Sequence, residues 1–319
     1  MKRVLVDQDI HPTQTIVDNL PSSWEVSVGI DADPGRLATA LTAVDIVLLT
    51  SRIDITASLL EEIPALDVIG KLGTGIDNID LEAATAAGIP VVYTPGYNAL
   101  SVAELGLGLL LGTARRFTEA RQLIESGQWR DAMTLGTRIS GSTVGIIGLG
   151  NVGKRFAKLL TGFDVDLCYT DPYIPSIDGE LVDGRAVDLA TLLETSDVVC
   201  VMPELTTETR GLIGSREFRL MRSDAIVINT ARGPVIDQDA LIEALQSGEI
   251  AGAGLDVFAT EPIDSDSPLL AVENVVVTPH VGAMTHEGRT KTITQLAKNV
   301  RAVIAGDPVE EACVAVPPR

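Results

Sequence analysis

Residues 143–160 read TVGIIGLGNVGKRFAKLL, an apolar stretch followed by a glycine-rich turn and a helix-like stretch. The glycines have the spacing GxGxxG at Gly148, Gly150 and Gly153. In this spacing the first glycine permits a tight turn, the second lets the backbone approach a pyrophosphate, and the third lets helix and strand pack closely. The start of the helix also attracts negative charge. The stretch therefore predicts the phosphate-binding turn of a dinucleotide-binding domain.

A carboxylate follows this turn at the distance that such a domain requires. Asp171 lies 171 − 148 = 23 residues after Gly148, directly behind the apolar stretch DLCYT at 166–170. There it can accept hydrogen bonds from an adenosine ribose. The next residues, Pro172, Tyr173 and Ile174, supply no cation for a 2′-phosphate. NAD is therefore predicted as the cofactor rather than NADP.

Apolar strand-like stretches alternate with helix-like ones on both sides of the glycine turn. Downstream the stretches are DLCYTD, DVVCVM, AIVINT, AGLDVF and VVVTPH, and upstream they are VLV, VDIVLLT, LDVIGKLG and IPVVYT. This alternation predicts parallel sheets with crossover helices, and 319 residues favour two domains. We expect an α/β fold of two Rossmann-like domains, one flavodoxin-like and one doubly wound, with a cleft between them.

Two helical stretches set the predicted domain boundaries. Residues 103–126 predict one long helix that joins the domains, and residues 285–306 predict an amphipathic helix closed by Gly306. The second helix follows the last predicted strand of the dinucleotide-binding sheet, so it is not needed by that domain. We therefore predict a substrate-binding domain of residues 1–98 and 285–319, and an NAD-binding domain of residues 99–284.

Composition excludes several classes of function. The formal net charge of −20 argues against nucleic-acid binding, which needs clustered Lys and Arg. The longest apolar helical run, around residues 105–114, is too short to span a bilayer, and the start MKRVLVDQDI lacks the features of a secretory signal. Cys168, Cys200 and Cys313 show no metal-ligand spacing and are expected to be core residues of a cytoplasmic protein. The scattered acidic residues fit a solvated surface or adaptation to high salt.

The chain resembles the D-isomer specific 2-hydroxyacid dehydrogenase family over nearly its whole length, and most closely the phosphoglycerate dehydrogenase branch. The resemblance rests on seven motifs in the family's order: KLGTGIDNID, TPGYNALSVAE, VGIIGLGNVGKR, YTDPY, VINTARGPVID, AGLDVFATEP and TPHVGA. It implies an NAD-dependent oxidoreductase that acts on a CH–OH group, with no metal.

The resemblance also implies the catalytic residues. Reduction of a 2-keto acid needs a cation for the carboxylate, an acid for the carbonyl oxygen and a placed hydride donor. Arg232 matches the family's catalytic arginine, His280 matches its acid/base, and Glu261 matches the carboxylate that orients the imidazole. Considered alone, Arg232 would be read as a solvated loop residue and Glu261 as a turn residue.

Binding residues follow from the same motifs. The predicted cofactor-binding residues are Gly148, Gly150, Asn151, Val152, Gly153, Asp171, Pro172, Met202, Pro203, Thr209, Thr230, Ala231, Asp256, His280 and Gly282. The predicted substrate-binding residues are Ser51, Arg52, Thr74, Gly75, Asn98 and Arg232. Bare backbone amides at Thr74 and Gly75 would let an acidic protein bind an anion. Asn98 could equally serve turn geometry, and Asp256 could be a strand-end carboxylate.

Two positions depart from the family's pattern. Thr50 stands where phosphoglycerate-type relatives usually carry the Arg of Arg-Ser, so Arg52 is either a second anion contact or a solvated side chain. Met202 stands where relatives commonly carry His, in a loop that is one residue longer. The first departure puts 3-phosphoglycerate in doubt as the substrate. The second predicts altered packing beside the cofactor.

Several functions stay open from the sequence. The candidate substrates are a phosphorylated or phosphonate-bearing hydroxy acid such as 3-phosphoglycerate, glyoxylate or hydroxypyruvate, and an oxyanion such as phosphite or a phosphonate. A non-enzyme alternative is an NAD-sensing corepressor-like binding protein, as some relatives are. We expect a small-molecule 2-hydroxy or 2-keto acid as the partner, with no nucleic acid and no membrane. The resemblance also implies a homodimer, because long helices of the nucleotide domains commonly pair across a twofold axis in this family, and residues 103–112 have the small-residue pattern for close helix contact.

Overall fold

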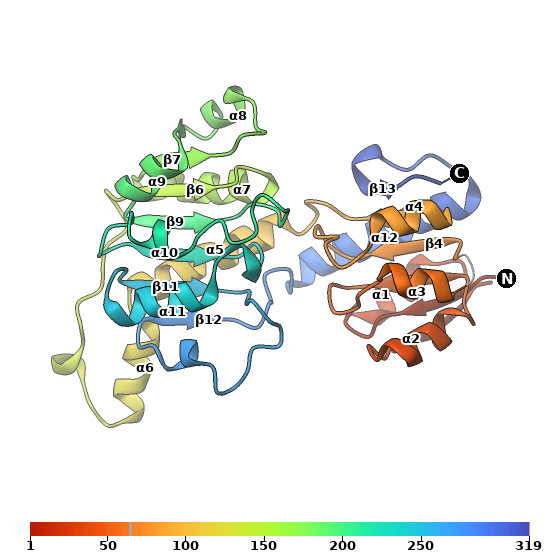
Figure 1. Ribbon diagram of the computed structural model, residues 1–319, viewed down its shortest axis with the longest axis horizontal. Coiled ribbons are helices and arrows are strands. Elements are labelled where there is room, and N and C mark those ends of the chain that lie inside the picture. Colours follow the sequence, from red (N-terminus) through yellow and green to blue (C-terminus); the bar gives the residue numbers. More distant parts are fainter. Residues whose placement is uncertain (64–65, 319) are drawn as a thin grey trace. The chain divides into compact units, whose positions relative to one another are not determined.

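The chain folds as two compact units in a computed structural model that describes residues 1–63 and 66–318. Unit 1 comprises Met1–Asn98 and Ala283–Arg319, and unit 2 comprises Ala99–Gly282 (Figure 1). The sequence placed the return to unit 1 two residues later, at residue 285. Each unit is built around its own mainly or wholly parallel sheet with helices on both faces, so the predicted pair of parallel-sheet α/β folds is confirmed.

Unit 1 contains a six-stranded sheet in the order β13-β5-β4-β3-β1-β2. Its strands are β1 (Arg3–Val6), β2 (Glu25–Val28), β3 (Ile46–Leu49), β4 (Val68–Lys71), β5 (Val91–Tyr93) and β13 (Val314–Val316). Its helices are α1 (Thr13–Asn19), α2 (Pro34–Leu41), α3 (Ala57–Glu62), α4 (Leu81–Ala87) and α12 (His286–Ala305). The order of β1 to β5 is flavodoxin-like, and β13 adds an antiparallel edge.

Apolar residues cover both faces of this sheet, as expected for parallel strands that are buried on both sides. Val4 and Val6 of β1 pack with Ile293 and Leu296 of α12 on one face, while Leu5 packs with α2 and α3 on the other. Each fully buried aliphatic side chain contributes about 1.5–3 kcal/mol relative to exposure. The predicted C-terminal helix therefore belongs to the core of unit 1.

Unit 2 contains a seven-stranded parallel sheet in the order β12-β11-β10-β9-β6-β7-β8. Its strands are β6 (Thr143–Ile147), β7 (Asp166–Thr170), β8 (Arg185–Ala186), β9 (Val198–Val201), β10 (Ile226–Asn229), β11 (Gly252–Leu255) and β12 (Val275–Val277). Its helices are α5 (Ala99–Ala114), α6 (Phe117–Glu125), α7 (Asn151–Leu160), α8 (Ser176–Glu180), α9 (Leu189–Thr195), α10 (Ser215–Phe218) and α11 (Gln238–Ser247).

The strand order of unit 2 is that of a doubly wound dinucleotide-binding fold. The chain proceeds outward from β6 to β7 and β8, then crosses to β9 on the other side. Ligands of such sheets bind where the order reverses, at the carboxyl ends of the strands. The glycine turn that follows β6 lies at this switch point. Helices α5 and α7 cover one face of the sheet, and α9, α10 and α11 cover the other.

The predicted long helix over residues 103–126 is wrong as a single element. The structure has two helices, α5 and α6, which are separated at Arg115 and Arg116. Arg116 has a φ of 54°, in the left-handed region that interrupts a helix, and its guanidinium pairs with Glu119 in the first turn of α6. The second helix therefore starts in a new direction. Among the described residues, no helix is both long and apolar enough to cross a bilayer.

Candidate active site

His280 and Glu261 lie side by side in loops at the carboxyl edge of the unit 2 sheet. The Nδ1 atom of His280 is 2.6 Å from Oε2 of Glu261, and both side chains are about one third exposed. The other carboxylate oxygen, Oε1, accepts a hydrogen bond of 3.0 Å from the backbone N–H of Phe258. Because the carboxylate is held at both oxygens, it fixes the plane of the imidazole. Nδ1 then carries the proton that bonds Glu261, and Nε2 is the remaining ring nitrogen.

The charge of Glu261 is stabilised by its surroundings. Burial raises the pKa of Glu261, but the hydrogen bond and charge of His280, the Phe258 amide and the charge of Arg232 outweigh burial. The pKa of Glu261 is therefore lowered from its ordinary value. An ionised carboxylate can only accept a hydrogen bond, so Nδ1 of His280 is the donor in this pair. The pair has the composition of a general acid/base and its orienting group.

Asp256 holds the loop that carries His280. Its carboxylate accepts hydrogen bonds from Thr278 Oγ1 at 2.6 Å, from the Val281 amide at 2.8 Å and from the Gly282 amide at 2.8 Å. The side chain is buried, and this burial raises the pKa of Asp256 despite the three bonds. His280 has a φ of 53°, a strained conformation for a non-glycine residue, and its N–H bonds the Asp256 carbonyl. The hydrogen bonds of Asp256 thus hold the backbone of His280 in this strained conformation.

Arg232 lies in the loop after β10, against the loop that carries Glu261. The side-chain amide of Asn229 donates to the Arg232 carbonyl and its oxygen accepts from the Ala231 N–H. A side chain at Gly233 would overlap the carbonyl of Phe258, so only glycine permits this approach of the two loops. Arg232 is also near enough to lower the pKa of Glu261. The structure therefore brings together all three predicted catalytic residues, from the ends of three neighbouring strands.

The glycine turn has the shape that a pyrophosphate requires. Gly148 has a φ of 87° and packs against the backbone of Pro203, and a Cβ at Gly153 would lie 2.3 Å from the Gly148 carbonyl oxygen. By contrast, a Cβ at Gly150 would meet no atom within 4 Å. Gly150 caps α7 without a side-chain hydrogen bond, so the first amides of this helix face open space. The residues present fit a dinucleotide phosphate.

Asp171 lies at the end of β7, beside this turn. Its Oδ2 accepts a 2.8 Å hydrogen bond from the Leu149 N–H, and its Oδ1 accepts from the Tyr173 N–H at 3.0 Å. The carboxylate therefore braces the glycine turn itself, a role that the sequence did not predict. Its remaining acceptor positions can bond ribose hydroxyls.

The other predicted cofactor residues occupy the same edge of the sheet. Met202 is buried, and its N–H donates a hydrogen bond to the Ile147 carbonyl. Thr209 Oγ1 donates a hydrogen bond to the Glu204 carbonyl. The hydroxyl of Thr230 is buried and has no hydrogen-bond partner among the described residues. The remainder lie in loops or helix starts that follow β6, β7, β9, β10 and β12: Asn151, Val152, Pro172, Pro203, Ala231 and Gly282.

The predicted substrate loop lies at the carboxyl edge of the unit 1 sheet. Thr74 Oγ1 donates a 3.3 Å hydrogen bond to Asn98 Oδ1 and accepts one of 3.1 Å from the Gly96 N–H. Thr74 and Asn98, both predicted to bind substrate, are therefore in contact. Within residues 1–63 and 66–318 the backbone N–H groups of Thr74 and Gly75 have no hydrogen-bond partner. Such amides are free to bind a carboxylate.

Arg52 forms an ion pair that its sequence context did not indicate. Ser51 is exposed, but the guanidinium of Arg52 pairs with the buried Asp7 and with Asp9. Asp7 was not among the predicted site residues. Its position directly behind the strand VLV, at the carboxyl edge of a parallel sheet, was the available signal.

Comparison with known proteins identifies the family. Residues 107–282 match the NAD binding domain of the D-isomer specific 2-hydroxyacid dehydrogenases. Glyoxylate reductase of Thermococcus litoralis is 41% identical over 269 residues, which cover 82% of this chain and 80% of that relative. The chain belongs to the D-isomer specific 2-hydroxyacid dehydrogenase family.

One further relative and one solved structure are similar to this chain over most of its length. D-3-phosphoglycerate dehydrogenase of Methanocaldococcus jannaschii is 37% identical over 315 residues, which cover 97% of this chain but only 59% of that relative's length. The crystal structure of a glyoxylate reductase from Paecilomyes thermophila has a TM-score of 0.87 at 28% identity and covers 97% of each chain. The predicted family, its oxidoreductase class and a nicotinamide dinucleotide cofactor are confirmed at the level of the family.

Proposed function

We propose that this protein is an NAD-dependent 2-hydroxyacid dehydrogenase that interconverts a 2-keto acid and its D-2-hydroxy acid. The observation that carries the proposal is the His280–Glu261 pair at 2.6 Å, with Arg232 in the adjoining loop. Glyoxylate reductase and D-3-phosphoglycerate dehydrogenase, the activities of two relatives, both belong to this class of reaction. Unit 2 is proposed as the cofactor-binding domain and unit 1 as the substrate-binding domain.

When bound, the nicotinamide would supply hydride to C2 of the keto acid or accept it from C2 of the hydroxy acid. His280 donates a proton from Nε2 to the carbonyl oxygen during reduction and takes it back during oxidation. Glu261 orients the ring and stabilises its charged form, and Arg232 binds the substrate carboxylate. The balance is 2-keto acid, NADH and one proton to 2-hydroxy acid and NAD.

The glycine turn and the first turn of α7 would hold the cofactor's pyrophosphate, and Asp171 would accept from its ribose. Asp256 would contribute by holding the His280 loop in its strained conformation. Thr74 and Gly75 would offer amides to the substrate. These assignments follow from the geometry of each unit taken separately.

A panel of 2-keto acids with NADH tests the proposal. We expect NADH to be consumed with at least one acid, and Arg232→Ala to lower kcat/KM on that acid by about 10³-fold or more. Arg216→Ala removes an exposed arginine from α10 in the same unit and serves as the matched control. Equal losses in the two variants, or no turnover with any acid, would overturn the assignment.

We also propose that the protein is a cytoplasmic homodimer. Phe117, Ile124, Trp129 and Leu135 are 60%, 65%, 67% and 93% exposed, which is unusual for large apolar side chains gathered within one segment. All three cysteines are free and buried, as is common in reducing compartments. Light scattering should give twice the chain mass of 33.7 kDa, and cell fractionation should place the protein with cytoplasmic markers.

A further inference from the structure

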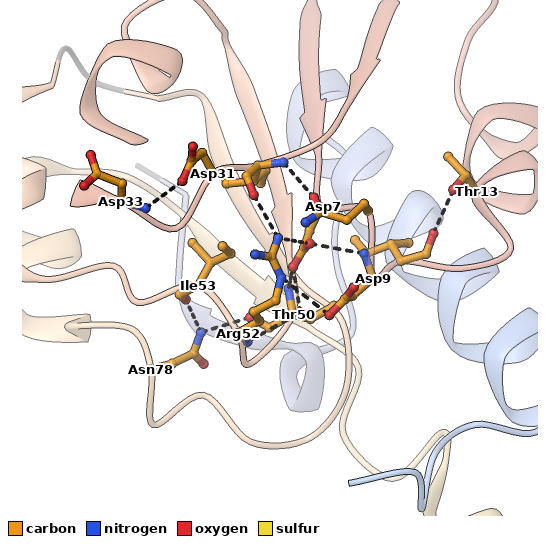
Figure 2. Close-up of polar contacts among 12 residues, drawn as sticks. Asp7, Asp9, Thr13, Asp31, Asp33, Thr50, Arg52, Ile53 and Asn78 are labelled. Atoms are coloured by element: carbon orange, nitrogen blue, oxygen red, sulfur yellow. Dashed lines mark hydrogen bonds and ion pairs between the residues drawn. The ribbon is translucent and has the colours of Figure 1, made fainter. Parts of the chain in front are cut away.

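A buried carboxylate holds the Arg52 side chain at the carboxyl edge of the unit 1 sheet (Figure 2). Nη2 of Arg52 lies 2.5 Å from Oδ1 of Asp7 and 3.0 Å from the carbonyl oxygen of Ile30. Nε lies 3.4 Å from a carboxylate oxygen of Asp9. The side chain of Asp7 is fully buried and that of Arg52 is 30% exposed. Two carboxylates, those of Asp7 and Asp9, therefore contact the guanidinium of Arg52.

Asp7 is fixed from several directions, so it cannot follow Arg52 elsewhere. Its Oδ2 accepts hydrogen bonds from the Thr50 hydroxyl at 2.6 Å and from the Thr50 N–H at 3.2 Å, and its Oδ1 accepts from the Asp9 N–H. Removing the cation from a buried carboxylate leaves a charge that water cannot reach, which is strongly unfavourable. A ligand that recruited Arg52 would have to bear this cost.

This cluster adjoins the predicted substrate loop. Strands β3 and β4 are parallel neighbours, with Leu49 opposite Lys71, so the Arg52 loop and the Thr74 loop leave the same edge of the sheet. The side-chain amide of Asn78 donates to the carbonyl oxygens of Thr50 and Ile53 and ties the two loops together. Figure 2 shows Asn78 reaching the loop that carries Arg52.

Two other cations, Lys71 and Arg289, belong to the same part of unit 1. Lys71 is 3% exposed and its ammonium donates to the Leu72 carbonyl beneath the substrate loop. Arg289 of α12 is partly buried, and the charges of Asp7 and Asp9 act on it as well as on Arg52; its Nε is buried and has no hydrogen-bond partner among the described residues. One carboxylate of a substrate has amides to bind, whereas the charges of Arg52 and Arg289 are offset by those of Asp7 and Asp9, so this cluster presents no net positive charge to a further phosphate dianion.

We propose that the Asp7–Arg52 ion pair makes this enzyme select 2-keto acids that carry no phosphate group. The proposal rests on the function proposed above and narrows its substrate class. Asp7 and Asp9 are specificity-determining residues in this view: they neutralise a cation that would otherwise attract a phosphorylated acid.

The test compares hydroxypyruvate with 3-phosphohydroxypyruvate as substrates for NADH oxidation. The unaltered enzyme should have the higher kcat/KM for hydroxypyruvate. Asp7→Asn keeps an acceptor for Thr50 but frees the charge of Arg52, and should raise the phosphorylated-to-unphosphorylated ratio of kcat/KM about tenfold or more. Asp9→Asn alters an exposed, weaker contact and should raise the ratio by about two- to threefold.

Asp67→Asn is the matched control, because Asp67 precedes β4 at the opposite edge of the sheet and forms an ion pair with Lys2. It removes the same charge and should leave the ratio unchanged. If Asp7→Asn does not fold, as circular dichroism would reveal, Asp9→Asn carries the test.

Binding separates failure of this proposal from failure of the proposed function. Calorimetric titration of D-glycerate and 3-phosphoglycerate into the NAD-saturated protein needs no turnover. If no acid is reduced, the proposed function fails, and tighter 3-phosphoglycerate binding by Asp7→Asn than by the unaltered protein still supports the role of the ion pair. A preference of the unaltered enzyme for the phosphorylated acid, or an unchanged ratio in both Asp variants, overturns it.

Discussion

Glu261 holds His280 through a 2.6 Å contact between Oε2 and Nδ1, while its Oε1 is held by the backbone N–H of Phe258. The carboxylate cannot rotate without losing one of these bonds. The imidazole is thereby fixed in one plane, with Nε2 as the nitrogen available for proton transfer. The Glu261 carboxylate therefore both orients the imidazole ring and places a negative charge beside it.

Glu261→Gln should lower kcat by about 10²-fold, within the usual contribution of acid/base catalysis, with little change in KM. Glutamine preserves the size of the side chain but removes the charge that stabilises the protonated imidazole. Steady-state kinetics with the best keto acid of the panel measure the effect. Glu243→Gln, on the exposed side of α11, is the control and should leave kcat and KM unchanged. A loss confined to KM would instead place Glu261 in substrate binding.

The stabilising effect of the Glu261 charge should depend on pH. Its pKa is lowered in the folded protein from the ordinary value of 4.5. A lowered carboxyl pKa stabilises the fold above the unfolded pKa, and this contribution disappears as the pH falls through the folded pKa. The difference in free energy of unfolding between the unaltered protein and Glu261→Gln should therefore shrink below about pH 4. Urea denaturation at neutral and acidic pH checks this, and a difference that grows in acid would refute it.

The sequence predicted the site because its residues stand at the ends of strongly apolar strands. Strands β10 and β11 are buried and β12 is apolar, and Arg232, Glu261 and His280 follow these three strands in loops that the sheet brings to one edge. The GxGxxG turn was predictable for the same reason, since the turn and the strand before it are adjacent in the chain.

Features that depend on tertiary contacts were not predictable. Strand β2 reads EVSV and is mostly exposed at a sheet edge, so it lacks an apolar signal, and β13 pairs with β5 from the far end of the chain. The break at Arg116 requires a positive φ that the helical pattern conceals. The ion pair between Asp7 and Arg52 spans 45 residues, and only the register of the sheet brings the two together.

Asp171 should determine the choice between NADH and NADPH. A 2′-phosphate placed near its charge would be repelled by about 1–4 kcal/mol, depending on solvent exposure. Asp171→Asn removes the charge and keeps an acceptor for the Leu149 amide. The NADPH-to-NADH ratio of kcat/KM should rise about tenfold or more. Asp166→Asn, at the opposite end of β7, should leave the ratio unchanged; a preference of the unaltered enzyme for NADPH would contradict the prediction.

Two alanine substitutions in the glycine turn should have opposite consequences. A Cβ at Gly153 would lie 2.3 Å from the Gly148 carbonyl oxygen, so Gly153→Ala must displace backbone and should destabilise the protein by about 1–3 kcal/mol. A Cβ at Gly150 meets nothing within 4 Å, and its φ of −77° suits alanine. Gly150→Ala should therefore fold with unchanged stability.

Gly150→Ala should nevertheless lose NADH affinity by about tenfold or more, because its methyl group would project where the pyrophosphate must approach the backbone. Thermal unfolding without cofactor and titration of NADH by fluorescence separate the two effects. The cofactor should also raise the melting temperature of the unaltered protein but not that of Gly150→Ala, since a ligand stabilises a fold only in proportion to its binding. Normal NADH affinity in Gly150→Ala would show that the open space beside Gly150 is not the phosphate site.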